Sequence, residues 1–150
     1  MSFNTIRDEI FALNGSVREP ALNSDFALFE AKFEVEIPFD AKAAFGIMNG
    51  ADYPTNPEKA WMRFWPIDEW RPAVDLFPEG AATKPCSELS FVVADYAIEC
   101  VYYVLDLEAA SPSNGQVFAL GATHTSQVAR SFADFVQMVC DNSQELHSYS

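Results

Sequence analysis

Three carboxylates are the first candidates for acid–base chemistry in this sequence. Asp95, Glu99 and Asp106 lie in or beside two segments dense in apolar residues. A paired-carboxylate site needs two acids in environments that separate their pKa values, and nothing in the residues around these three indicates such a separation. Solvated acids at the edges of strands are the simpler interpretation.

Other residue types that carry chemistry are sparse and poorly spaced. The six glycines form no phosphate-binding motif, and no serine lies in the Gly-x-Ser-x-Gly pattern of a nucleophile elbow. His124 and His147 have no histidine or cysteine three or four residues away, which argues against a metal site. The sequence therefore predicts no catalytic residue, no metal ion and no cofactor, and we expect the chain not to be an enzyme.

The three cysteines form no recognisable disulfide or zinc pattern. Cys86, Cys100 and Cys140 are an odd number and include no Cys-x-x-Cys pair. Cys100 and Cys140 lie in apolar stretches, where a free cysteine usually behaves as a small buried hydrophobe. We expect structural thiols.

The charge of the chain restricts its partners. Twenty-two acidic residues against nine lysines and arginines give a net charge of −13. Proteins that neutralise phosphates by contact are usually basic, so direct nucleic-acid binding is not expected. No lysine or arginine occurs between Lys84 and Arg130, which predicts a negative face. Such a face can serve solubility alone, or it can attract a basic protein.

The length and the apolar runs predict one domain over residues 1–150. The longest apolar run, residues 100–105, is far shorter than the roughly 20 residues that a membrane helix needs. The first residues lack the basic and apolar regions of a secretory signal. We therefore expect a cytoplasmic chain that has no membrane partner and is a monomer or a weak dimer.

The first half of the chain shows three helical patterns. Apolar residues recur at helical spacing over residues 3–13, 23–33 and 38–48, and Pro38 fits the first position of the third helix. Asn14-Gly15 and Asn49-Gly50 follow the first and third patterns, because glycine accepts the left-handed conformation beyond a helix end. Residues 51–57 contain two prolines and are predicted to form a surface loop.

The second half is rich in β-branched and aromatic residues. Strands are predicted over residues 61–65, 89–94, 100–107 and 116–120, with one helical turn at 67–70 and an irregular connection over 71–86. The polar residues 122–126 are predicted to link these strands to a last helix after Ser131. The apolar stripe of that helix consists of Phe132, Phe135, Val136, Val139 and Cys140.

This order of elements predicts an α+β fold. Short links between the last three strands favour a mostly antiparallel sheet, of about four to six strands in all. Helices precede the strands and one helix follows them, so helices from both ends of the chain are expected to pack on the sheet.

Two stretches carry motifs that occur together, in this order, in a known superfamily. The first combines Ile37-Pro38, the helix that ends at Asn49-Gly50 and the aromatic segment 61–70. The second combines segments 91–96, 101–107 and 115–118 with the Ser-Phe-x-x-Phe start of the last helix at Ser131. Over residues 23–142 the chain resembles the SUKH superfamily of Smi/Knr-like domains, which includes fungal cell-wall assembly regulators and many bacterial immunity proteins.

The resemblance implies helices packed against a mostly antiparallel sheet, without cofactor or catalytic residues. It also implies a protein partner, because similar bacterial proteins bind and neutralise a cognate toxin, often a nuclease, in the cytoplasm. Nucleases tend to be basic, and an acidic surface would speed their approach and suppress wrong partners. We therefore expect a protein-binding module of the immunity type. The alternative is a regulatory or scaffold domain of the cell-wall assembly regulator type, with no toxin partner.

The expected docking surface combines aromatic anchors with carboxylates, because tyrosine and tryptophan give large, rigid contacts. The candidate partner-binding residues are Asp52, Tyr53, Trp65, Asp68, Glu69, Asp95, Tyr96 and Glu99. Trp65, at the end of a predicted strand, is also a candidate core residue. Replacing Asp95 and Glu99 with lysine is expected to weaken the complex without unfolding the domain.

Overall fold

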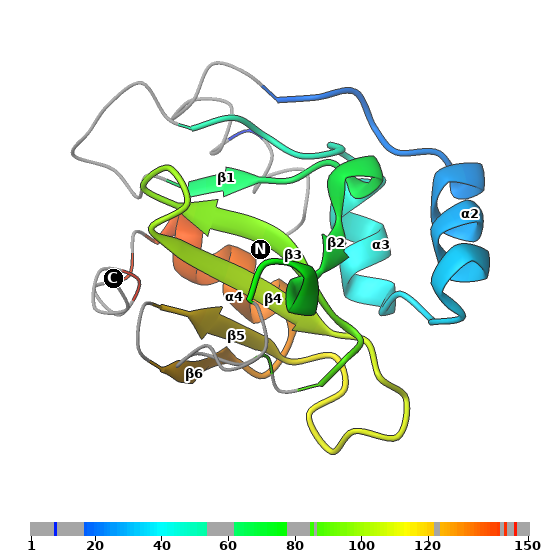
Figure 1. Ribbon diagram of the computed structural model, residues 1–150. Helices are drawn as coiled ribbons and strands as arrows, with labels where there is room; N and C mark the ends of the chain where they lie inside the picture. The colour runs from blue at the N-terminus through cyan, green and yellow to red at the C-terminus, as the bar shows by residue number, and fades with distance from the viewer. Residues whose placement is uncertain are drawn as a thin grey trace.

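A six-stranded antiparallel sheet lies at the centre of the described part of the molecule (Figure 1). The computed structural model describes residues 8, 17–53, 62–77, 85, 87–121, 124–141, 143 and 146. The strands are β1 (Met62–Phe64), β2 (Arg71–Pro72), β3 (Ser90–Tyr96), β4 (Val101–Asp106), β5 (Val117–Leu120) and β6 (Thr125–Ala129). Their order is β1-β3-β4-β5-β6, and β2 also pairs with β3. The predicted α+β fold is confirmed.

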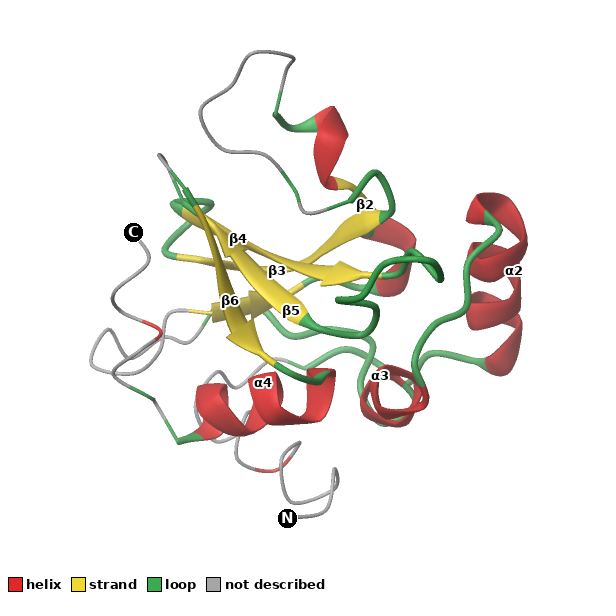
Figure 2. Ribbon diagram, turned by 90° about the horizontal axis from the view of Figure 1, so that it is seen from below, coloured by secondary structure: helices red, strands yellow, loops and turns green. Residues whose placement is uncertain are grey.

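Helices cover one face of this sheet. They are α2 (Asn23–Phe33), α3 (Phe39–Phe45) and α4 (Phe132–Cys140). Two short 3-10 turns, η1 (Ile67–Glu69) and η2 (Ala73–Asp75), lie between β1 and β3 in the chain. Figure 2 shows α3 and α4 on the same side of the sheet, with α2 beside α3. Phe135 of α4 contacts the rings of Phe64 and Tyr103, with centroids 6.0 and 5.0 Å away. Side chains alternate along a strand, so Arg63 and Tyr102 lie on the opposite face.

The start of α4 combines a local cap with a cap from a distant helix. The Ser131 hydroxyl accepts a hydrogen bond from the Asp134 backbone N–H at 3.1 Å, as its predicted N-cap role requires. The Asp40 carboxylate, from the first turn of α3, accepts another from the Ala133 N–H at 2.9 Å. This second bond joins α3 to α4. Because the two helices are far apart in the sequence, no local pattern indicates this contact.

Aromatic rings connect the N-terminal helices to the sheet. The ring of Trp70 forms T-shaped pairs with Phe29 from α2 and Phe45 from α3, with ring centroids 5.5 and 4.9 Å away. Phe29 also contacts Phe91 of β3 at 5.0 Å. The indole N–H of Trp70 donates to the Trp65 carbonyl at 2.9 Å, so this buried side chain leaves no polar atom unpaired.

Several predicted elements are confirmed, and some differ in length. The helices at 23–33 and after Ser131, the single turn at 67–70 and the strands near 62–64, 90–94, 101–106 and 117–120 are present. The third helix ends at Phe45, three residues early, because the chain turns at Gly46. The helix predicted over residues 3–13 lies outside the described residues, except for Asp8, which is helical, and residues 54–57 of the predicted loop also lie outside them.

Four predictions were wrong. Strand β6 takes up the last two residues of the predicted polar link, Thr125 and Ser126, because its backbone pairs with β5 although its sequence shows no apolar alternation. Strand β2 and turn η2 lie within the connection predicted to be irregular. Ala51 is buried and bridges Val17 and Phe64, so it is not part of a surface loop. Cys100 is exposed at the end of the β3–β4 turn, while Cys140 is half-buried.

A buried carboxylate organises the loop that connects β4 to β5. Asp106 is fully buried, and it accepts hydrogen bonds from the hydroxyls of Ser87, Ser111 and Ser113 at 2.8, 2.7 and 2.5 Å. The backbone N–H of Glu108 donates a fourth at 3.0 Å. Burial raises the pKa of Asp106, but the four hydrogen bonds outweigh burial and bring the pKa below its usual value.

The lowered pKa of Asp106 predicts acid sensitivity. An acid whose pKa is depressed by folding stabilises the fold above its unfolded value of about 3.9, and this stabilisation is lost as the pH falls through the folded pKa. We expect Asp106→Asn to lower the free energy of unfolding at pH 7 and to flatten its decline below about pH 4. Urea unfolding at a series of pH values measures both effects, and parallel pH curves for the two proteins would contradict this prediction.

Two glycines with positive φ give a matched test of close packing. Gly50 has φ +94, and an added Cβ would lie 2.7 Å from the Phe64 carbonyl oxygen and 2.9 Å from the Pro66 nitrogen. Gly115 has φ +84 and open space around it. We expect Gly115→Ala to lower the free energy of unfolding by about 1 kcal/mol, from backbone strain alone. Gly50→Ala should lower it by about 3 kcal/mol, because backbone must also move. Equal losses in urea unfolding would rule out the steric contribution.

Candidate protein-binding site

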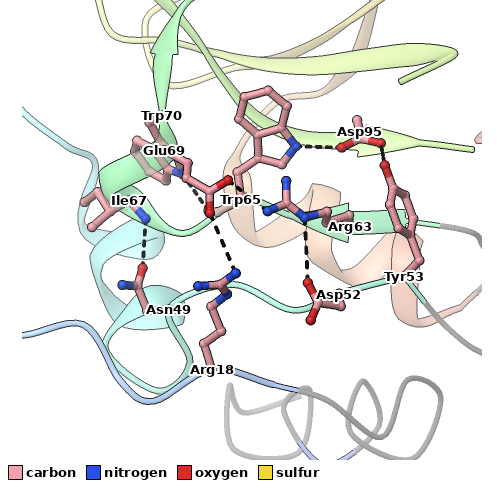
Figure 3. A network of polar contacts seen from close by, with 10 residues as sticks. All are labelled: Arg18, Asn49, Asp52, Tyr53, Arg63, Trp65, Ile67, Glu69, Trp70 and Asp95. Carbon is pink, nitrogen blue, oxygen red and sulfur yellow. Dashed lines mark hydrogen bonds and ion pairs between the residues drawn. The ribbon is translucent and has the colours of Figure 1, made fainter. Parts of the chain in front are cut away.

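The candidate site is built around one buried carboxylate on the face of the sheet opposite α4 (Figure 3). Asp95 of β3 is 1% exposed. The indole N–H of Trp65 donates to its Oδ2 at 2.6 Å, and the backbone N–H of Glu99 donates to its Oδ1 at 3.0 Å. The Tyr53 hydroxyl donates to the same Oδ1. Asp95 therefore joins the segment after α3, the end of β1 and the β3–β4 turn.

A β-bulge brings Asp95 to this face. Where β3 pairs with β4, the register shifts by one residue between Val92 and Ala94. A shift of one residue reverses the face of the sheet on which the following side chains lie. Beyond the bulge Asp95 pairs with Tyr102 and Arg63 and shares their face. In an unshifted register Asp95 would turn toward the face that α4 covers, away from Trp65.

Two tyrosines stay protonated beside this carboxylate. Burial, followed by the hydrogen bond to Asp95 and the charge of Asp95, raises the pKa of Tyr53 far above its usual value. Burial and the nearby charges of Glu99 and Asp95 also raise the pKa of Tyr102. Tyr53 therefore remains a hydrogen-bond donor to Asp95 over the whole physiological pH range.

A layer of ion pairs lies next to the buried network. The Arg63 guanidinium donates to Glu69 Oε1 at 2.9 Å and lies 3.7 Å from Asp52 Oδ1. The Arg18 guanidinium lies 3.7 Å from the other oxygen of Glu69. Asp52 and Glu69 are 52% and 41% exposed, so both carboxylates remain accessible to another molecule.

Two guanidinium groups lie over the indole ring of Trp65. Arg63 and Arg71 lie 5.7 and 5.9 Å from its ring, within the range of a cation–π contact. The ring of Tyr102 meets Trp65 edge-on at 6.2 Å. Trp65 is only 5% exposed, which confirms the core interpretation of this residue. Trp65 is therefore a buried support of the site and not part of its exposed surface.

The structure brings most of the predicted site residues together but differs in their exposure. Asp52, Glu69 and Glu99 are exposed around the buried network, and Tyr53 and Tyr96 are half-buried. Asp68 is exposed on η1, where it lines a hollow of about 240 Å³ beside α2. A role of these residues in binding stays a prediction.

Two expectations about acids are wrong. Asp95 and Asp106 are both buried and hydrogen-bonded, and neither is a solvated acid at a strand edge. They also do not converge on one site, since Asp95 lies toward the turn end of the β3–β4 hairpin and Asp106 at its other end. A lysine at position 95 would bury a cation, so the expectation that this substitution leaves the fold intact is wrong as well.

Sequence reasoning missed the arginines of this site. The stretch from residue 85 to 129 contains no lysine or arginine, but Arg63 pairs with Asp95 and Arg71 with Val92 across neighbouring strands, and Arg18 joins the same site through Glu69. The surface therefore alternates acids with arginines and is less uniformly negative than predicted. The one available signal was Arg63, a charged residue between the apolar residues of a predicted strand.

No protein-family model matches the sequence, and no curated protein matches it. In the part of the chain that the structure describes, no group of three or more histidine, cysteine, aspartate or glutamate residues could hold a metal ion. No helix among the described residues is long and apolar enough to cross a membrane.

The burial of Asp95 predicts a large loss of stability when its carboxylate is removed. Asp95→Ala would leave the donors of Trp65, Tyr53 and Glu99 without their acceptor, so we expect the free energy of unfolding to fall by about 4 kcal/mol. The same change at the exposed Asp68 is the matched control and should alter it by less than about 0.5 kcal/mol. Urea unfolding followed by circular dichroism measures both variants. Similar losses at the two positions would contradict a central role for Asp95.

Proposed function

We propose that this chain is a non-catalytic protein-binding module of the immunity type, which binds and neutralises a basic toxin domain. One observation carries the proposal. The exposed carboxylates of Asp52, Glu69 and Glu99 surround a buried network in which Asp95 fixes three separate segments. Because these segments are already held in place, the carboxylates can meet a partner without a further ordering step.

The rigidity of the network favours binding. Association has to overcome the entropy lost when side chains and loops become ordered at an interface. Tyr53, Trp65 and the backbone of Glu99 are already ordered by hydrogen bonds to Asp95. A partner that docks on this surface therefore meets groups that lose little further freedom.

The ion pairs favour a cationic partner. Exposed ion pairs contribute little to folding, about 0–1 kcal/mol each. Lysine or arginine side chains of a partner can therefore share Asp52 and Glu69 with Arg63 and Arg18 without unfolding the domain. The net charge of −13 adds long-range attraction, which speeds encounter with a basic protein.

The resemblance to the SUKH superfamily supports the same class of function. Its motifs include Asn49-Gly50, whose asparagine side chain accepts a hydrogen bond from the Ile67 N–H at 2.8 Å. They also include Ser131, which caps α4. An immunity protein works by occupying its toxin and needs no chemistry of its own, which agrees with a surface of paired charges.

A pull-down with matched charge-reversal variants tests this proposal. The tagged chain is incubated with lysate of its source cell, and the retained protein is identified, purified and titrated. We expect Asp52→Lys/Glu99→Lys to weaken binding about tenfold or more, and more strongly at low salt. Glu36→Lys/Asp141→Lys makes the same change in net charge at exposed positions outside the network, and it should keep most of the affinity.

Different outcomes separate the parts of the proposal. Coexpression with the retained protein should relieve the growth defect that a toxin causes. A retained protein without toxicity would replace the immunity role with the regulatory one. Equal weakening by both double variants would remove this site from the proposal, and retention of no protein at all would reject the binding module.

A further inference from the structure

The turn between β3 and β4 has an unusual backbone. Ala97, Ile98 and Glu99 have φ angles of 52, 55 and 64 degrees, three left-handed residues in succession. L-residues avoid this region, β-branched residues most of all, while glycine and asparagine tolerate it. Left-handed non-glycine residues are strained, and they persist only where the surrounding structure enforces them.

Two contacts from the end of β3 hold this turn in place. The Asp95 carboxylate accepts the hydrogen bond from the Glu99 N–H at 3.0 Å. The Tyr96 carbonyl accepts one from the Cys100 N–H at 3.0 Å. Because Trp65 and Tyr53 also bind Asp95, the buried network imposes the conformation of the turn. The strain is therefore maintained by the same carboxylate that organises the site.

The strained turn displays an apolar side chain to solvent. Ile98 is 62% exposed, and Glu99 and Cys100 beside it are exposed as well. The other large exposed apolar residues include Leu22, Leu28 and Phe39, which do not have positive φ. Ile98 thus combines an unfavourable backbone conformation with a side chain that gains little from folding.

We propose that this turn is the anchor of the docking surface, with Ile98 entering an apolar pocket of the partner and Glu99 pairing with a lysine or arginine at the rim of that pocket. The proposal rests on the proposed function and adds its central contact. Binding energy concentrates in a few side chains that are fully desolvated at the middle of an interface. A rigid apolar tip beside a carboxylate fits that role.

The occupant is a basic protein surface. The turn lies within the stretch from 85 to 129, which carries no lysine or arginine, so the residues next to the tip in the sequence offer it no cation. The net charge of −13 opposes both an anionic membrane and a second copy of this chain. A partner with a cationic rim around an apolar pocket complements Ile98 and Glu99 together.

Two glycine variants of the free protein test the strain. Ile98→Gly and Ala97→Gly each relax one left-handed residue, but only the first removes the apolar tip. We expect the melting temperature to rise by about 3 °C for Ile98→Gly and by less for Ala97→Gly, because a β-branched residue is strained more than alanine. A fall for Ile98→Gly would show that the turn is not strained and would overturn the proposal.

The same variants test the anchor in the complex. The probe is the purified protein that the wild-type chain retains from its own lysate. We expect Ile98→Gly to bind it about thirtyfold more weakly, as loss of a central contact does, and Ala97→Gly to bind within about twofold of wild type. Wild-type affinity of Ile98→Gly would overturn the anchor while leaving the proposed function intact. Failure of the wild-type chain to retain any protein would overturn both.

Cys100 provides a second measurement on the unmodified sequence. Its thiol is exposed at the end of the turn. We expect its alkylation by a maleimide, followed by mass spectrometry, to slow about tenfold in the complex, since a docked partner excludes reagent from the fully desolvated centre of an interface. Cys140, half-buried on α4, is the internal control and should react at an unchanged rate. Unchanged reactivity of Cys100 in a saturated complex would place the interface elsewhere and overturn the proposal.

Discussion

The arrangement of the candidate site depends on one buried carboxylate with three hydrogen-bond donors. Asp95 receives an indole N–H, a phenol O–H and a backbone N–H from three segments of the chain. A buried carboxylate without such partners would be strongly destabilising, so each donor also makes the burial tolerable. The consequence is mutual constraint, because Trp65, Tyr53 and the β3–β4 turn are each positioned by a group that they help to stabilise.

The β3–β4 hairpin carries a second buried carboxylate at its other end. At both ends, hydrogen-bond donors compensate for the burial of a charged group. Asp106 gathers three serine hydroxyls and one backbone N–H, and thereby fixes the loop between β4 and β5. Neither acid is placed to exchange a proton with the other, since each is saturated by its own donors. Both stiffen connections of the central hairpin, which leaves the loops at either end rigid enough to present a defined surface.

The sequence predicted those elements whose side chains repeat with a clear period. The stripe of Phe132, Phe135, Val136 and Val139 predicted α4, and dense β-branched residues predicted the central hairpin. Strand β6 was missed because backbone pairing, and not an apolar face, determines it. The exposure of Asp95 was mispredicted for a different reason, since the face on which it lies depends on a one-residue register shift that no side-chain pattern records. The aromatic rings of Tyr53 and Trp65 made them candidates, but no pattern in the sequence indicates that both donate a hydrogen bond to Asp95.

The strained β3–β4 turn depends on the buried carboxylate of Asp95. Left-handed residues at 97–99 are tolerable only if something holds them, and the carboxylate that holds them is itself inaccessible to solvent. Exposed carboxylates on the same surface can therefore vary in sequence with modest effects on folding, whereas Asp95 cannot. Under the proposed function, this division assigns recognition to the outer residues and shape to the buried ones. If the proposed function holds, substitution at Asp52, Glu69, Ile98 or Glu99 would change the partner, while Asp95 would keep the conformation of the surface.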